Sequence, residues 1–163
     1  MNPVHLHLML NHIPLVGVGF VILLFVLAIF LRSNQLINIS LIFTILVALW
    51  AIPAHQTGES AEEYVKNLPG YSDQLVQDHD IAADISFIVI EIVGVLALIS
   101  LGARRFYKKI AQTLTILTLV GLILGGVLLA RAANLGGKIH HPELRQDNSA
   151  VNSPSYNSEN RHD

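Results

Sequence analysis

Residues 5–31 read HLHLMLNHIPLVGVGFVILLFVLAIFL, and this stretch decides the fold class. From Ile13 to Leu31 it runs for 19 residues without a charged side chain, which is long enough for an α-helix to cross a bilayer. Just before this run stand His5, His7 and His12, with Met9 between them. The stretch therefore predicts a membrane helix that carries a group of histidines at one end.

The composition of the whole chain also indicates a membrane protein. Of its 163 residues, 52% are hydrophobic and 13% are charged, whereas about 25% of the residues of a soluble protein are charged. The net charge is −2, so no basic surface for a nucleic acid is expected. The chain has no cysteine, which excludes disulfides, covalent c-type haem and cysteine-ligated iron–sulfur clusters.

Three further apolar stretches have the length and composition of membrane helices. We predict spans at about 13–31, 36–54, 85–102 and 110–130, with tight turns after the first and the third. The fold class is therefore all-α, an integral membrane up-down four-helix bundle.

One transmembrane domain is expected over residues 1–145, followed by a disordered polar tail at 146–163. Two breaks are expected at the ends of the spans. The capping pattern of Ser60–Glu63 predicts a separate surface helix. Gly136 and Gly137 predict an interruption before His140 and His141.

The density of basic residues predicts how the bundle is oriented. Arg104, Arg105, Lys108 and Lys109 crowd one short turn that has no acidic residue, and Arg32 lies in the other turn on that side. The positive-inside rule places these turns in the cytoplasm. Both termini then lie outside, so we expect a multi-pass protein of the bacterial inner membrane with its histidines on the periplasmic side.

Histidines gather at the outer ends of the predicted helices, and none lies near the inner turns. At about 1.5 Å per helical residue, two of them lie about 28–30 Å above the inner turns and three lie about 33–39 Å above them. The deeper two are His12 and His55, and the others are His5, His7 and His79. The candidate metal ligands are His12, His55, His79 and His141, followed by His7, His5 and His140.

On the first helix, His5, Met9 and His12 share one face, which we expect to face the interior of the bundle. By the same geometry, His7 points about 140° away from His12. His12 is therefore the ligand that the helix geometry favours, whereas the motif described below favours His7 as well.

Imidazole ligands suit haem iron, copper and zinc alike. A haem with two histidine ligands needs two imidazoles facing each other across an apolar slot, which the interior of a bundle supplies. We therefore expect haem b in one or two copies, with two favoured. Cations near the outer surface would bind the haem propionates or act as ordinary interface anchors. They are Arg131, Lys138 and Arg145.

One acidic residue, Glu91, lies near the middle of the third predicted span. An acid at this depth is a candidate for a functional group, such as a proton relay or a quinol contact. Alternatively, it is a neutral side chain that is hydrogen-bonded to Thr113, Thr115 or Thr118.

Two motifs resemble those of a broad family of predicted four-helix bacterial membrane proteins. His7-Leu-Met-Leu-Asn-His12-Ile-Pro14 resembles the family's H-P-x-x-V-H-F-P opening, with Leu8 in place of its first proline. Gly136-Gly-Lys-Ile-His-His141-Pro-Glu resembles its G-G-x-apolar-x-H motif near the end of the fourth helix. The resemblance implies a four-helix membrane fold and an association with haem b or redox chemistry.

The arrangement is also similar to small di-haem b-type cytochromes with four helices, which commonly place haems near opposite membrane faces. This chain has no histidine near the inner turns. We therefore expect electron transfer at the outer face rather than across the membrane.

The sequence thus predicts a membrane-bound b-type cytochrome that carries electrons at the outer face through one or two bis-histidine haems. Two histidine ligands leave no open position on the iron, so we expect an electron carrier rather than a catalyst. The expected partners are the lipid bilayer, a quinol donor and a periplasmic redox partner, and the bundle is compatible with a homo-oligomer. Two alternatives stay open: a copper- or zinc-binding protein for metal handling, and a structural subunit of a respiratory or transport complex.

Overall fold

The computed structural model describes residues 3–66 and 73–140, and this part of the chain is all-helical. It comprises α1 (Pro3–Phe30), α2 (Asn34–Lys66), α3 (Asp73–Ala103) and α4 (Lys108–His140). Each helix is long and apolar enough to cross a membrane. The prediction of four long apolar helices is therefore confirmed, and the chain is compatible with a multi-pass membrane protein.

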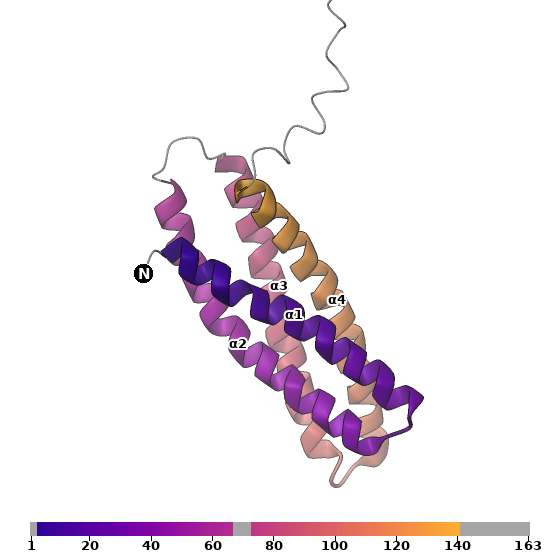
Figure 1. Ribbon diagram of the computed structural model, residues 1–163. Helices are drawn as coiled ribbons and strands as arrows, with labels where there is room; N and C mark the ends of the chain where they lie inside the picture. The colour runs from indigo at the N-terminus through magenta and orange to yellow at the C-terminus, as the bar shows by residue number, and fades with distance from the viewer. Residues whose placement is uncertain (1–2, 67–72, 141–163) are drawn as a thin grey trace, which may run out of the picture.

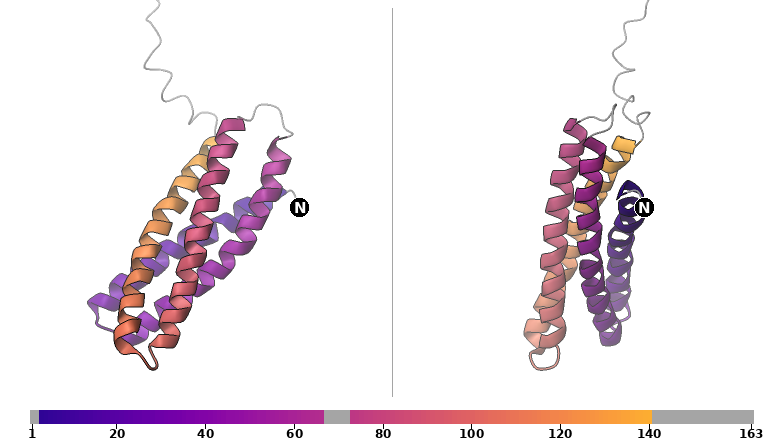
Figure 2. Two further views of the ribbon diagram at one scale, coloured as in Figure 1. Left: turned by 180° about the vertical axis from the view of Figure 1, so that it is seen from behind. Right: turned by 90° about the vertical axis from the view of Figure 1, so that its left-hand side faces the viewer.

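The helices form a ring in chain order, in which each packs against the next and α4 returns to α1. The start of α1 and the end of α4 lie at one end of the bundle, and the two tight turns lie at the other (Figure 1). We call these the histidine end and the turn end. Contacts are densest within the α1–α2 and α3–α4 hairpins, which lie side by side in Figure 2, and sparsest between α1 and α4.

The turn between α1 and α2 is closed by local hydrogen bonds. Arg32 adopts a left-handed backbone conformation with φ 51°. The Ser33 N–H donates to the Ala28 carbonyl at 2.9 Å, and the Ser33 hydroxyl accepts from the Leu36 N–H at 3.2 Å. These bonds satisfy backbone groups that would otherwise be unpaired at the end of α1 and the start of α2, so α2 begins directly after the turn.

Arg104, just beyond α3, ties the turn end together. It donates to the side chains of Asn34 and Asn38 at the start of α2. Its partial burial between the two helices lowers the pKa of Arg104 from the ordinary value of arginine. The second hairpin is thereby fixed to the first at this end.

Both breaks that the sequence predicts are wrong, because α2 continues through Ser60–Glu63 to Lys66 and α4 continues through Gly136 and Gly137 to His140. In α2, the Thr57 hydroxyl donates to the carbonyls of Pro53 and Ala54 at 2.9 and 3.0 Å and stabilises the turn after the proline. In α4, Gly136 packs against the His79 ring. Such packing outweighs the cost of about 1 kcal/mol for a helical glycine.

The second hairpin repeats the burial pattern of the first. Each of the five buried residues of α1 lies 72 positions before a buried residue of α3. Five of the buried residues of α2 lie 78 positions before a buried residue of α4. The pairs are Pro14/Ser86, Val18/Ile90, Val21/Val93, Phe25/Ala97 and Ala28/Ser100, then Ser40/Thr118, Thr44/Leu122, Val47/Gly125, Ala54/Ala132 and Ala61/Ile139. The hairpins are therefore related by an approximate twofold axis along the bundle.

Among the described residues, most buried hydroxyl groups are bonded within their own helices, whereas Ser100 of α3 bonds to Ala111 and Thr115 of α4. Ser40, Thr44, Ser86 and Thr118 each donate to the carbonyl four residues earlier, which satisfies a hydroxyl inside an apolar bundle. Thr113 and Thr115 make the same type of bond. Within the residues that the structure describes, Glu91 Oε1 is buried without a hydrogen-bond partner, so the predicted bond to a threonine is not present.

Candidate cofactor site

A cavity of about 600 Å³ lies among all four helices in the half of the bundle near the histidine end. This volume is within the range of small-molecule and cofactor pockets, about 300–1,000 Å³. Its deeper lining includes Pro14, Ile90 and Leu129. An apolar cluster with one side chain from each helix borders it at the histidine end: Val4, Val65, Val76 and Ile139.

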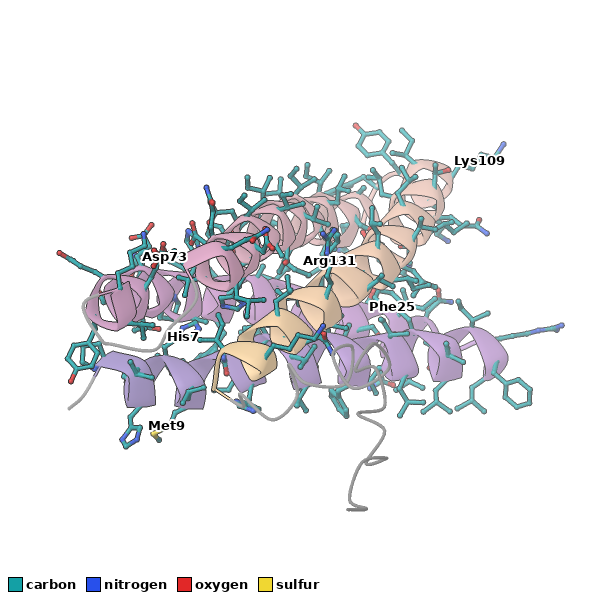
Figure 3. All side chains as sticks on the ribbon, turned by 90° about the horizontal axis from the view of Figure 1, so that it is seen from above. His7, Met9, Phe25, Asp73, Lys109 and Arg131 are labelled. Carbon is teal, nitrogen blue, oxygen red and sulfur yellow. The ribbon has the colours of Figure 1, made fainter. Side chains whose placement is uncertain are left out.

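His7 reaches from α1 to α2 and lines this cavity. Its Nδ1 donates to the Ala54 carbonyl at 3.1 Å. Its ring lies on Gly58, where an added Cβ would be 3.1 Å from the His7 Cε1. Since Nδ1 carries the proton, Nε2 of the neutral ring has the lone pair that a metal ion requires. Figure 3 shows His7 on the side of α1 that faces the other helices, and Met9 on the opposite side.

His79 makes the equivalent arrangement between α3 and α4. Its Nδ1 donates to the Ala132 carbonyl at 2.9 Å. Its ring lies on Gly136, where an added Cβ would be 3.1 Å from the His79 Cε1. His79 follows His7 by 72 positions, and Ala132 and Gly136 follow their counterparts in α2 by 78. The approximate twofold axis therefore relates two half-sites, and each hairpin contributes one of these two equivalent imidazoles to the same cavity.

His12 and His55 also line the cavity but have different surroundings. His12 is exposed, and its Nδ1 donates to the carbonyl of Leu8 in its own helix at 2.6 Å. The His55 ring stacks on Phe87, with centroids 4.2 Å apart and an interplanar angle of 12°. Its two nitrogens lie 3.8 Å from carboxylate oxygens of Glu59 and Asp84.

The prediction that His5 and Met9 face the bundle interior is wrong, whereas His12, the third residue of that face, lines the cavity. His5 is exposed, and 65% of Met9 is exposed. The buried face of α1 is set by Pro14, Val18 and Val21, and His7 lies on this face because it precedes Pro14 by two helical turns. The packing of the apolar residues thus directs His7 to the cavity and His5 away from it.

Other predicted site residues lie outside the cavity lining or outside the described residues. Arg131, labelled in Figure 3, is exposed, and neither Arg131 nor Lys138 belongs to the described lining. The side chain of His140, and the whole of His141 and Arg145, lie outside the described part of the chain. Their predicted roles stay predictions.

Carboxylates line the cavity wall that α2 and α3 form. Glu59, Glu62 and Asp80 belong to this wall. Asp80 precedes the apolar stretch 85–102, and its burial, followed by the nearby Glu62 carboxylate, raises the pKa of Asp80 above its ordinary value. Lys66 pairs with Glu62 at 2.5 Å. The wall is thus polar at the histidine end.

The two imidazoles with matched surroundings come from opposite hairpins and line the same cavity. In residues 3–66 and 73–140, no three histidine, aspartate or glutamate side chains are grouped so as to hold one metal ion. One imidazole from each hairpin lines the same mostly apolar cavity, and such a cavity could hold a planar cofactor between two histidines.

The sequence analysis missed four residues that hold the two imidazoles, namely Ala54, Gly58, Ala132 and Gly136. It also missed Asn11, which lines the cavity with a buried Oδ1 that has no hydrogen-bond partner. A comparison of the two halves of the chain would have found the first four, because Ala-x-x-x-Gly recurs with the same spacing as the buried residues of α2 and α4.

No family model, no curated protein and no solved structure matches this chain. The family resemblance of the two histidine motifs therefore stays a prediction. The fold and the site define a class of protein: a bundle of four long apolar helices with two equivalent histidines around one cavity.

Proposed function

We propose that this protein is a membrane-bound b-type cytochrome whose haem is held in the cavity by His7 and His79. The observation that carries this proposal is the matched environment of the two imidazoles. Each donates its Nδ1–H to a carbonyl of the neighbouring helix and lies on a glycine. Metal-ligating histidines are commonly fixed in this way, because the bond sets both the tautomer and the ring orientation.

The other residues of the cavity fit this cofactor. Pro14, Phe87, Ile90 and Leu129 supply apolar lining, and the apolar cluster at the histidine end limits the entry of water. A bound haem would supply one-electron redox chemistry. The chain supplies the binding energy, the orientation of the two imidazoles and the low-polarity surroundings that tune the potential.

We propose one haem, whereas two are favoured by the sequence alone. The described residues contain one matched pair of histidines, and the surroundings of His12 and His55 differ from those of that pair. His12 is bonded to its own helix, and His55 is flanked by two carboxylates and the Phe87 ring. Copper or zinc handling has less support, because His5 and Met9 are exposed.

We further propose that the bundle spans the bacterial inner membrane, with the turn end in the cytoplasm and the cavity on the periplasmic side. The basic residues of the turn end support this orientation. With two histidine ligands on its haem, the protein would carry electrons rather than catalyse bond chemistry. Its partners would be a membrane quinol as the donor and a periplasmic redox protein as the acceptor.

A visible absorption spectrum of the purified protein tests this proposal. We expect wild-type protein, produced with an adequate haem supply, to show the sharp bands of reduced haem b. His7→Ala and His79→Ala should each remove most of the bound haem, whereas His5→Ala, a change at an exposed histidine of the same helix, should not. A colourless wild-type protein, or full haem content in both cavity variants, would contradict the proposal.

A further inference from the structure

The approximate twofold axis gives the cavity two seams, one between α2 and α3 and one between α1 and α4, and the two seams carry different residues. The α2–α3 seam has aromatic and charged side chains, and the equivalent positions of the α1–α4 seam are mostly small or aliphatic. The equivalent pairs are His55/Ala133, Glu59/Gly137, Asp80/Leu8, Asp84/His12 and Phe87/Leu15. The two seams of the cavity therefore differ in polarity although the hairpins are approximately symmetric.

The α1–α4 seam is open to the surface. His12 of α1 and Ala133 of α4 both line the cavity and are both exposed. A Cβ added to Gly137, which also lines the cavity, would meet no atom within 4 Å. At the other seam, the stacked rings of His55 and Phe87 bridge α2 and α3. A ligand within the bilayer would thus reach the cavity between α1 and α4.

Two hydrogen-bond acceptors belong to the α1 side of this opening. Asn11 Oδ1 is buried and has no partner among the described residues. His12 donates from Nδ1 to the Leu8 carbonyl, so Nε2 of its neutral ring is an acceptor. An unpaired buried acceptor is costly, and a ligand that donates a hydrogen bond removes this cost. The opening therefore favours an apolar molecule with a hydroxyl group.

We propose that the α1–α4 opening binds the ring of a lipid-soluble hydroquinone, with one hydroxyl directed to Asn11 and His12. The binding itself follows from the opening and its acceptors, and the assignment of this ligand as the electron donor rests on the proposed function. The oxidised quinone has carbonyl groups in place of hydroxyls and cannot donate to these acceptors. A site that is built for a hydroxyl discriminates strongly against an analogue that lacks it.

The test is calorimetric titration of the haem-loaded protein in detergent with 2-decyl-1,4-hydroquinone and with the corresponding quinone. We expect the hydroquinone to bind at least tenfold more tightly. Asn11→Leu and His12→Phe, which keep the volume and remove an acceptor, should each reduce this preference several-fold. Gly137→Leu should fill the opening and weaken hydroquinone binding at least tenfold. Gly19→Leu is the matched control, because a Cβ there also meets nothing within 4 Å.

Equal affinity for the two forms, or unchanged hydroquinone binding by Gly137→Leu, would overturn this proposal. The haem spectrum of each variant separates it from the proposed function. Wild-type protein that binds haem through His7 and His79 but shows no preference for the hydroquinone would refute only the hydroquinone site. Protein without haem that still binds the hydroquinone through Asn11 would refute only the cytochrome.

Discussion

Gly136 shows how one missing Cβ can define the position of an imidazole ring. The His79 ring occupies the place next to Gly136, and an added Cβ would be 3.1 Å from Cε1. A branched side chain there must displace the ring and lengthen its bond to the Ala132 carbonyl. We expect Gly136→Val to weaken haem binding about tenfold to a hundredfold, the usual range for a lost supporting contact. Titration of the apoprotein with haem, followed by absorbance, measures this change.

Gly19 of α1 supplies the control for this substitution. It lies outside the cavity lining, and a Cβ there meets no atom within 4 Å, so Gly19→Val has the same backbone cost without the contact with the ring. Gly58→Val should reproduce the effect at His7, since the two half-sites are equivalent. If Gly136→Val and Gly19→Val bound haem equally well, the His79 ring would not need its present position.

The sequence predicts some residue-scale features of the site and not others. The height of each histidine along its helix can be predicted from the sequence, because a helix rises by a fixed amount per residue. The direction of each imidazole is not, because α1 is apolar on most sides and its buried face depends on what α2 and α4 present to it. For this reason His7 enters the cavity, while His5 and Met9, which share a face with His12, are exposed.

In close contacts between helices, the glycine lies on one helix in one contact and on the opposite helix in the symmetry-related contact. Gly94 of α3 receives Ala48 of α2, whereas the equivalent contact has Ile22 on α1 and Gly126 on α4. Gly17 of α1 receives Val47 of α2, whereas the equivalent contact has Val89 on α3 and Gly125 on α4. The small residue has changed sides each time, and the close approach of the helices is kept.

This exchange predicts that a clash at Gly94 can be corrected from the other helix. A Cβ on Gly94 would lie 2.5 Å from the Ala48 Cβ, so we expect Gly94→Ala to lower the free energy of unfolding by about 1–3 kcal/mol, as overpacking does. Adding Ala48→Gly should recover most of this loss, because it removes the second carbon of the clash. Unfolding by sodium dodecyl sulfate, followed by far-ultraviolet circular dichroism, measures both values.

Gly19→Ala controls for helix propensity in this series, since a Cβ at Gly19 meets nothing within 4 Å. It should leave the stability unchanged or raise it by up to about 1 kcal/mol. If the double variant were less stable than Gly94→Ala alone, the α2–α3 contact would not have the geometry described here.

At the scale of helices, apolar runs predict the number and order of the elements, whereas local breakers predict their ends poorly. Pro53, Gly136 and Gly137 weaken a helix in isolation, and all three lie inside continuous helices. The contacts that extend these helices join residues far apart in the chain, such as His7 with Ala54 and His79 with Ala132. A window of local sequence contains no information on them.

For the molecule as a whole, the twofold relation explains why one cavity receives two equivalent histidines. A planar ligand near the axis would meet one equivalent imidazole from each hairpin. The two seams differ, so the α2–α3 side of the cavity is polar and the α1–α4 side opens to the surface. Electron transfer to a periplasmic acceptor, as proposed, requires that the histidine end, and with it the α1–α4 opening, lies on the outer side of the membrane.

The absence of cysteine from the chain makes this orientation directly testable. Ser60 is exposed near the histidine end, and Phe106 is 78% exposed in the turn between α3 and α4. In intact Gram-negative cells, a membrane-impermeant maleimide should label Ser60→Cys and should label Phe106→Cys only after the membrane is disrupted. The physical reason is the cluster of basic residues around Phe106, which resists translocation.

Wild-type protein, which has no thiol, sets the background of this labelling, and a haem spectrum of each variant shows that its fold is intact. The reverse pattern, with Phe106→Cys labelled in intact cells, would place the cavity on the cytoplasmic side. The proposed haem site at His7 and His79 would not be affected by that result, since the pairing of these residues depends on the bundle alone. Only the acceptor would change, from a periplasmic to a cytoplasmic redox partner, so the orientation decides where the electrons leave.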